Sequence, residues 1–392
     1  MAALGFSVLL SKLKQPVVLG QLVAGILIGP FGLGLIQDVN TINLLASLGI
    51  ILLLFTVGLE LDPLEIRRIG AGSIMLTTVE LTISFVTVLA ASLLVGLTYL
   101  ESVFIAITVA TTSTAIMGKL LLENKTLKTK ESHLALTASV IEDFATVFIL
   151  LLLPGLVVAN SQVPASDLQF FIAKGVLLLA VIFLFGWKIA PRLIERFLVD
   201  NSYHETAFLL ALSFGFVFAL LSSYLGFSPA IGAFLMGLMI RGKQAEFITE
   251  KIGPIKDLFV VLFFVSMGTL INIGTVLTLT LPILAVITVA IGGKFFGSWL
   301  GARISNGKSG ATELAVSMLP RGEFSFIVAA DGTALGVASQ ILYPVAGLTT
   351  LASSIGASLG LRLLRRRKGL EARSQIPLIE MSIRDMEGEN VE

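Results

Sequence analysis

The sequence predicts an all-α polytopic membrane protein, and three observations lead to that fold class. Of the 392 residues, 55% are hydrophobic and only 14% are charged, with a mean hydropathy of +0.95. Soluble globular domains carry charge on about a quarter of their residues. Apolar runs of about 20 residues, long enough to cross the hydrocarbon core of a bilayer, follow one another along the chain. This composition argues against a soluble enzyme.

Counts of the chemically active residues exclude further classes. The net charge of +1 provides no basic field for nucleic acid. The absence of cysteine from the sequence excludes a disulfide framework, thiol catalysis and a cysteine-based metal site. The two histidines, His133 and His204, are far apart and do not form a His-rich cluster. We expect no cofactor, no nucleic-acid partner and no enzyme activity.

Charged or Pro/Gly-rich breaks divide the chain into about twelve to thirteen transmembrane helices. The apolar start, Met1–Leu10, is too short to span about 30 Å and is interpreted as a short first helix. The spans that follow are expected near 16–36, 41–61, 70–96, 100–122, 132–157, 168–191, 204–226, 227–241, 253–271, 276–304, 309–330 and 338–362.

Lysine and arginine predict how these spans are oriented, because every second connection is basic and the connections between them lack both residues. By the positive-inside rule the basic connections are cytoplasmic. The sequence therefore indicates a multi-pass protein of the cell (inner) membrane with a cytoplasmic C-terminal tail, 363–392. The basic connections contain Lys12/Lys14, Arg67/Arg68, Lys119–Lys130, Arg192/Arg196, Arg241–Lys256, Arg303/Lys308 and Arg362–Lys368.

The two halves of the chain echo each other. The stretch Pro16–Gly25 resembles Pro229–Gly237, and Leu54–Gly58 resembles Phe264–Gly268 at nearly the same offset. The first copy begins at a cytoplasmic connection and the second at a non-cytoplasmic one, which predicts two inverted repeats joined by the helix 168–191. Inverted repeats are typical of secondary transporters. Chance recurrence of small residues, common in any transmembrane bundle, is the alternative.

Two spans carry a polar interruption at corresponding places. One contains four consecutive hydroxyl residues, Thr111, Thr112, Ser113 and Thr114, whose side chains can compete with backbone hydrogen bonds. The other contains Pro320 followed by Arg321 and Glu323, and proline removes a helical hydrogen bond. We expect both spans to unwind and cross at mid-membrane. Arg321 and Glu323 would compensate the helix ends, with direct ion contact as the alternative.

Ionisable residues within spans are functional hypotheses by default, and Glu142 and Asp143 stand out among them. Adjacent helical residues point about 100° apart, so one carboxylate can face an aqueous cavity while the other faces a partner. Lys294, flanked by glycines that admit a close helix, is the expected partner. A simple packing ion pair is the alternative. Glu80 is expected to be protonated, near the lipid or the bundle interior, and receives no role.

Eight short stretches in a fixed order make the chain similar to the monovalent cation:proton antiporter-2 family. It resembles NapA-type Na⁺/H⁺ antiporters and the membrane domain of Kef-type K⁺ efflux systems. The stretches are QPVVLGQLVAGILIGP (15–30), LLLFTVGLELDP (52–63), VATTSTAI (109–116), VIEDF (140–144), SPAIGAFLMGL (228–238), LFFVSMG (262–268), GGKFFG (292–297) and LPRGEFSFIVA (319–329).

The resemblance implies an NhaA/NapA-like fold, a homodimer in the lipid bilayer and elevator-type alternating access. Asp143 matches the family's ion- and proton-binding aspartate, Lys294 its paired lysine and Thr112 a polar position in the unwound helix. Glu142 departs from the family, which has Asp (NapA-type) or Gln (Kef-type) there. The implied division is a scaffold of 1–61 and 204–271, an ion-binding core of 70–157 and 276–362, a linking helix of 168–191 and a tail of 363–392.

These features predict a secondary antiporter that exchanges Na⁺ for H⁺ by competition for Asp143. Asp143, Glu142 and Thr112 would bind Na⁺ (or K⁺) and H⁺, and Lys294 would hold Glu142 when the site is empty. Alternatives are a Kef-type K⁺/H⁺ antiporter, a Na⁺-coupled solute symporter, a gated cation channel and a membrane enzyme. The basic run Arg365–Lys368 is a candidate contact for anionic lipid.

Overall fold

The computed structural model describes residues 1–13, 15–61, 70–160, 165–198, 204–278, 280–307, 310–337 and 340–388, and every regular element within these ranges is a helix. The helices are α1 (Ala2–Lys12), α2 (Val17–Ile28), α3 (Val39–Glu60), α5 (Ala71–Leu94), α6 (Tyr99–Thr108), α7 (Thr114–Glu123), α8 (Lys130–Asn160), α9 (Ala165–Lys188), α10 (Ala190–Leu198), α11 (His204–Tyr224), α12 (Pro229–Met239), α13 (Lys243–Thr269), α14 (Ile273–Thr278), α15 (Thr280–Asn306), α16 (Ala311–Ser317), α17 (Glu323–Ala334) and α18 (Leu342–Gly388). Several basic residues that predict the orientation are not fully described. Lys14, Arg67, Arg68 and Lys308 lie outside the described residues, and the side chains of Arg367 and Lys368 are not described.

The helices confirm the predicted fold class. Within the described residues, eight helical segments are long and apolar enough to cross a membrane. They are α3, α5, α8, α9 continuing into α10, α11, α13, α15 and the first part of α18. Each of the twelve expected spans coincides with one helix or with two shorter ones, and the apolar start forms the short helix α1.

One expected span, 16–36, is much shorter in the structure. Helix α2 has only 12 residues and ends at Ile28, with Gly29 as its C-cap. Pro30 follows, and proline cannot donate the backbone hydrogen bond that would continue the helix. Helix α12, which carries the echo of α2, is equally short with 11 residues and has proline at its first position, where the missing N–H costs nothing.

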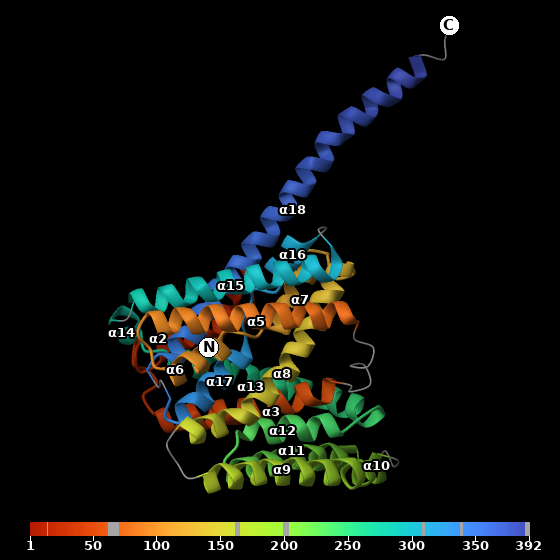
Figure 1. Cartoon of the computed structure of the whole chain (residues 1–392). Coiled ribbons are helices and arrows are strands. Elements are labelled where there is room, and N and C mark those ends of the chain that lie inside the picture. The colour runs from red at the N-terminus through yellow and green to blue at the C-terminus, as the bar shows by residue number, and fades with distance from the viewer. Residues whose placement is uncertain are drawn as a thin grey trace.

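The bundle is layered, as Figure 1 shows. Helices α5 and α15 run side by side along one face, and they pack against each other. Helices α9, α10 and α11 form the opposite face. Helices α6, α8, α17 and α13 lie between these faces, and α18 projects out of the bundle toward the C-terminus. Helix α8 contacts α5, α7, α16, α17, α12 and α9, so it connects the layers.

The echoed glycines meet in reciprocal pairs. Gly25 on α2 lies against Gly268 on α13, where a Cβ atom on Gly25 would be 2.9 Å from the Gly268 Cα. Gly58 on α3 lies against Gly237 on α12, where a Cβ atom on Gly237 would be 3.2 Å from the Gly58 Cα. Two repeats related by a two-fold axis would form such contacts as a matched pair. The repeat itself stays a prediction, with this contact pattern in its favour.

Two pairs of half-helices meet in the middle of the bundle. Helix α6 starts at a capping box formed by Thr98 and Glu101 and ends after 10 residues. The chain is not helical from Val109 to Ser113, where α7 begins. It is likewise not helical between α16 and α17, at 318–322. The two interruptions touch directly, since the Ser113 N–H donates to the Pro320 carbonyl oxygen over 2.7 Å.

The glycine contact between α2 and α13 yields a stability prediction. In Gly268→Ala the new methyl group would meet the backbone carbonyl of Leu22, so one helix must shift, and overpacking of this kind costs about 1–3 kcal/mol. We expect a lower melting temperature of the purified protein in detergent. Gly118→Ala on α7 is the matched control, because its methyl group meets no atom within 4 Å. Equal melting temperatures for both variants would show that α2 and α13 do not pack this closely.

Candidate ion-binding site

Helix α8 places two adjacent carboxylates inside the bundle. The Glu142 side chain is fully buried, and Asp143 is 7% exposed. Because adjacent helical residues point about 100° apart, the two have different neighbours. Glu142 contacts Lys294 on α15, and Asp143 contacts Thr114 on α7. The structure therefore separates the two acids into an ion-paired one and one that forms no ion pair within the described residues.

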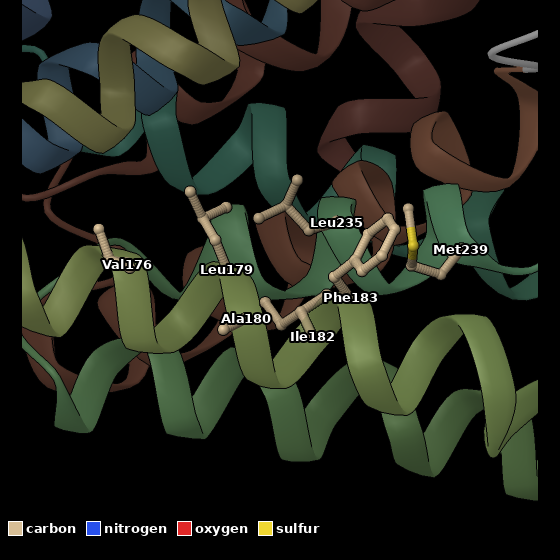
Figure 2. A pocket seen from close by; sticks show the side chains of 7 residues that line it. All are labelled: Val176, Leu179, Ala180, Ile182, Phe183, Leu235 and Met239. Atoms are coloured by element: carbon tan, nitrogen blue, oxygen red, sulfur yellow. The ribbon is translucent and has the colours of Figure 1, made fainter.

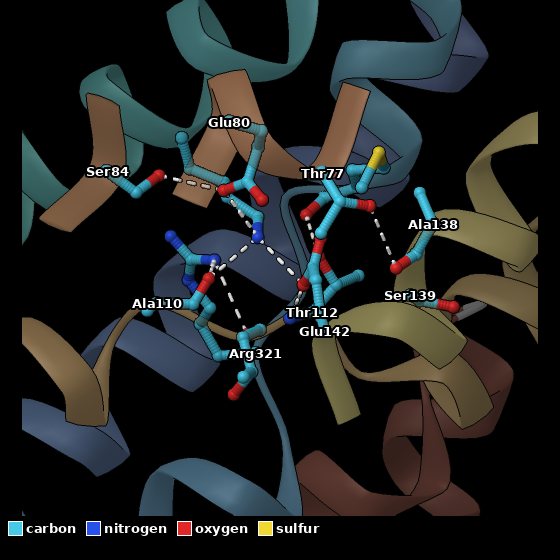
Figure 3. Close-up of polar contacts among 12 residues, drawn as sticks. Thr77, Glu80, Ser84, Ala110, Thr112, Ala138, Ser139, Glu142 and Arg321 are labelled. Carbon is cyan, nitrogen blue, oxygen red and sulfur yellow. Dashed lines mark hydrogen bonds and ion pairs between the residues drawn. The ribbon is translucent and has the colours of Figure 1, made fainter. Parts of the chain in front are cut away.

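The ammonium group of Lys294 has three acceptors, on Glu80, Glu142 and Ala110, which are labelled in Figure 3. Its Nζ atom lies 3.0 Å from Glu142 Oε2, 2.6 Å from Glu80 Oε1 and 2.7 Å from the carbonyl oxygen of Ala110. An ammonium group has three N–H donors, so each has a partner. The structure thus brings together Lys294 and Glu142, as expected from sequence, and adds a second carboxylate.

Glu80 is the residue of this cluster to which the sequence analysis assigned no role. It lies in α5 with its side chain fully buried, and Ser84, one turn later, donates to Glu80 Oε1 over 2.9 Å. An acid within a 24-residue apolar helix is the available sequence signal. The sequence does not indicate which residue pairs with Glu80, because only the packing of α5 on α15 shows that Glu80 contacts Lys294.

Arg321 binds the carbonyl oxygens beyond the end of α6. Its guanidinium donates to the carbonyls of Ala110 (3.0 Å) and Thr111 (3.4 Å), and to that of Ala290 on α15 (3.2 Å). The C-terminal end of a helix has partial negative charge, which a cation stabilises. These contacts fit the expectation that Arg321 compensates the partial charge of a helix end, which stays a prediction. Its side chain is fully buried.

Glu323 lies at the N-terminal end of a helix, where the partial charge is positive. It lies in the first turn of α17, where the helix dipole favours a negative charge. The Ser113 hydroxyl donates to Glu323 Oε2 over 3.3 Å and also caps α7 by accepting from the Ile116 N–H. Ser113 therefore links the two interruptions through its side chain as well as its backbone.

Asp143 contacts the hydroxyl group of Thr114, which in turn contacts that of Ser139. Thr114 Oγ1 lies 3.2 Å from Asp143 Oδ2 and 3.0 Å from the hydroxyl of Ser139, one turn earlier on α8. Asp143 Oδ1 and Glu142 Oε1 are buried and have no hydrogen-bond partner within the described chain. Unpartnered buried oxygens call for an explanation, such as an ion. Carboxylate and hydroxyl oxygens together are ligands suited to a hard cation.

Thr112, the threonine proposed from sequence as a cation ligand, has other contacts. Its hydroxyl donates to the carbonyl of Met318 over 3.0 Å, and its backbone N–H donates to Glu142 Oε2 over 2.7 Å. The hydroxyl thus satisfies a carbonyl at the end of α16. A ligand role for Thr112 stays a prediction, whereas Thr114 is the threonine of this segment that touches Asp143.

A groove elsewhere on the molecule does not have the chemistry of an ion site. It lies between α9 and α12, has a volume of about 420 Å³ and is shown in Figure 2. All of its lining side chains are apolar, and they offer no oxygen ligand. The lining residues are Val176, Leu179, Ala180, Ile182, Phe183, Leu235 and Met239. This groove therefore offers no candidate ion site.

Comparison with known proteins gives one consistent result. The family model described as "Sodium/hydrogen exchanger, transmembrane" matches residues 1–366. The Na(+)/H(+)-K(+) antiporter GerN of Bacillus cereus is 33% identical over 335 residues, which cover 84% of each chain. The glutathione-regulated potassium-efflux system protein KefC of Enterobacter sp. (strain 638) is 29% identical over 79% of this chain and 50% of its own.

A solved structure shares the fold. The sodium proton antiporter MjNhaP1 of Methanocaldococcus jannaschii matches with a TM-score of 0.68, covering 94% of both chains at 20% sequence identity. The resemblance found in the short sequence stretches is thereby confirmed at the level of the family. The buried carboxylates, the charge-compensated helix ends and these matches agree: the chain belongs to the sodium/hydrogen exchanger family, whose members are membrane transporters and not enzymes.

Proposed function

We propose that this chain exchanges Na⁺ for H⁺ through competition of the two ions for the carboxylate of Asp143. Cation/proton antiport is the activity that family membership supports. The observation that supports the finer proposal is the contrast between the two acids of α8. Glu142 is bound to Lys294, whereas Asp143 is buried, hydroxyl-lined and forms no ion pair within the described residues.

Charge balance explains why such a site would couple the two ions. Around Asp143, Glu80 and Glu142 both form ion pairs with Lys294, and Arg321 is a second cation with a fully buried side chain. Asp143 adds one uncompensated negative charge when it is deprotonated. An isolated charge is costly within a membrane. Binding of either H⁺ or Na⁺ neutralises this charge. The core can therefore move with either ion bound, but not with an empty site.

We propose Asp143, Thr114 and Ser139 as the cation-facing group, with Glu142 as a further ligand. Thr114 takes the place that Thr112 held in the sequence-based proposal, because its hydroxyl lies beside Asp143 Oδ2. Na⁺ prefers oxygen ligands of this kind. Arg321 and Glu323 are proposed to hold the crossed half-helices in place rather than to bind the ion.

Alternating access is proposed to follow the division into a core of 70–157 and 276–362 and a scaffold of 1–61 and 204–271. The packing of α5 on α15 within the core, and of α3 on α12 and α13 within the scaffold, supports this division. We also propose a homodimer in the cell (inner) membrane with a cytoplasmic C-terminus. The alternation of basic connections supports that orientation.

K⁺/H⁺ exchange is the second candidate, and the names of two relatives favour testing it. GerN is named as an Na(+)/H(+)-K(+) antiporter and KefC as a potassium-efflux protein, although this chain spans only half of KefC. Proteoliposomes containing a pH-sensitive dye should report proton flux after addition of Na⁺ and, separately, of K⁺. A larger response to K⁺ would assign the second candidate in place of the first.

The central prediction concerns the unpaired carboxylate. Asp143→Asn should abolish cation-driven proton flux for Na⁺, K⁺ and Li⁺, because the amide neither releases a proton nor offers a negative charge. Asp38→Asn is the control, since Asp38 is an exposed N-cap of α3 and asparagine caps helices equally well. Flux that persists in a folded Asp143→Asn protein would remove Asp143 from the mechanism.

A second prediction separates the two threonines. Thr114→Val removes a hydroxyl worth about 1 kcal/mol beside Asp143, so the apparent KM for the cation should rise about fivefold while turnover persists. Thr112→Val removes the bond to Met318 instead, so it should lower thermal stability and leave the KM close to that of the unmodified protein. Dye-quench titrations and melting curves measure both. The reverse pattern would return the ligand role to Thr112.

A further inference from the structure

Glu80 forms an ion pair with the same lysine as Glu142. Its carboxylate binds Lys294 Nζ over 2.6 Å, closer than the 3.0 Å between Lys294 and Glu142. Both side chains are completely buried. A second hydrogen bond, from Ser84, holds the same Glu80 oxygen. Lys294 therefore has a carboxylate partner that does not belong to α8.

The two ends of this ion pair lie on helices packed tightly together. A Cβ atom on Gly297 of α15 would lie 3.0 Å from the backbone carbonyl oxygen of Glu80, and one on Gly301 would lie 2.9 Å from that of Leu76. Such small residues let two helices approach closely along their length. The Glu80–Lys294 pair is thus a contact between two closely packed helices, whereas Glu142 reaches Lys294 from α8.

This arrangement matters when Glu142 turns toward a cation. If Glu142 were the sole partner of Lys294, its departure would leave a buried ammonium group without a counter-charge. A buried charge in that position either destabilises the state or loses its proton. Loss of that proton would add a second H⁺ to each exchange cycle. With Glu80 in place, Lys294 keeps a carboxylate partner at 2.6 Å.

We propose that Glu80 is a positioning residue that keeps Lys294 protonated throughout the cycle, so that one H⁺ is exchanged for one monovalent cation without net movement of charge. This inference rests on the proposed function. In the exchange step Asp143 gives up its carboxyl proton and its carboxylate takes one Na⁺, so the charge of the site is the same before and after. Glu80, ionised beside Lys294 rather than protonated as expected from the sequence, keeps its charge, and so do Glu142, Lys294 and Arg321.

The first experiment measures the charge moved per cycle. The purified full-length protein is reconstituted into proteoliposomes, and the Na⁺ gradient that just balances a fixed pH gradient is found at zero potential and at about 100 mV. Movement of one net charge per cycle would shift this balancing gradient about 50-fold, which corresponds to about 2.3 kcal/mol. For the unmodified protein we expect the same balancing gradient at both potentials.

Glu80→Gln should change that result. Lys294 is then left with Glu142 alone and releases its proton when Glu142 turns to the cation, so the balancing gradient should shift with potential by up to about 50-fold. The control is Glu60→Gln, which removes an acid from an exposed ion pair with Lys256 (3.4 Å). A potential-dependent gradient in the unmodified protein, or an unshifted one in an active Glu80→Gln variant, would overturn the proposal.

The second experiment does not depend on transport. If either acid suffices to hold Lys294, Glu80→Gln and Glu142→Gln should each lower the melting temperature modestly, and the double variant should lose more than the two losses added together. Additive losses would show that the acids do not share Lys294 and would overturn the proposal. A protein that shows this coupling but no cation-driven proton flux would contradict the proposed function and leave the shared ion pair standing.

Discussion

The buried ammonium group of Lys294 is the contact on which the centre of this protein depends. It joins the side chain of Glu80 on α5, that of Glu142 on α8 and the backbone carbonyl of Ala110 beyond α6, while Lys294 itself belongs to α15. No water competes for these groups in hydrocarbon, and a buried charge without partners is costly. Four segments are therefore held in one relative arrangement, because each supplies part of the same electrostatic balance.

The interrupted helices are possible for the same reason. Non-helical backbone at membrane depth is tolerated only where its polar groups find partners inside the protein. Here the partners are exchanged between the two interruptions. Arg321 of the second break binds the carbonyls of Ala110 and Thr111 in the first. In return, the Thr112 hydroxyl binds the Met318 carbonyl and the Ser113 N–H binds that of Pro320. Each break supplies the donors that the other lacks.

The rest of the bundle differs from this centre in its chemistry. Where α2 meets α13 and α3 meets α12, the contacts are between glycines and backbone, without charge. Close packing of small residues holds helices together in a membrane by van der Waals contact. Asp143, in contrast, contacts the hydroxyl of Thr114 and lies next to Glu142, which pairs with Lys294.

The sequence by itself determined the membrane class, the approximate positions of the helical segments and the two polar interruptions, because hydropathy and backbone hydrogen bonding act over a few neighbouring residues. It also singled out Asp143, since an acid within an apolar span stands out without a structure. Only the tertiary structure decided which partners these groups have. Thr114 rather than Thr112 lies beside Asp143, and Glu80 shares Lys294 with Glu142. The physical reason is that a buried charge is satisfied by whichever group the packing of distant helices brings within about 3 Å, and no local pattern encodes that distance.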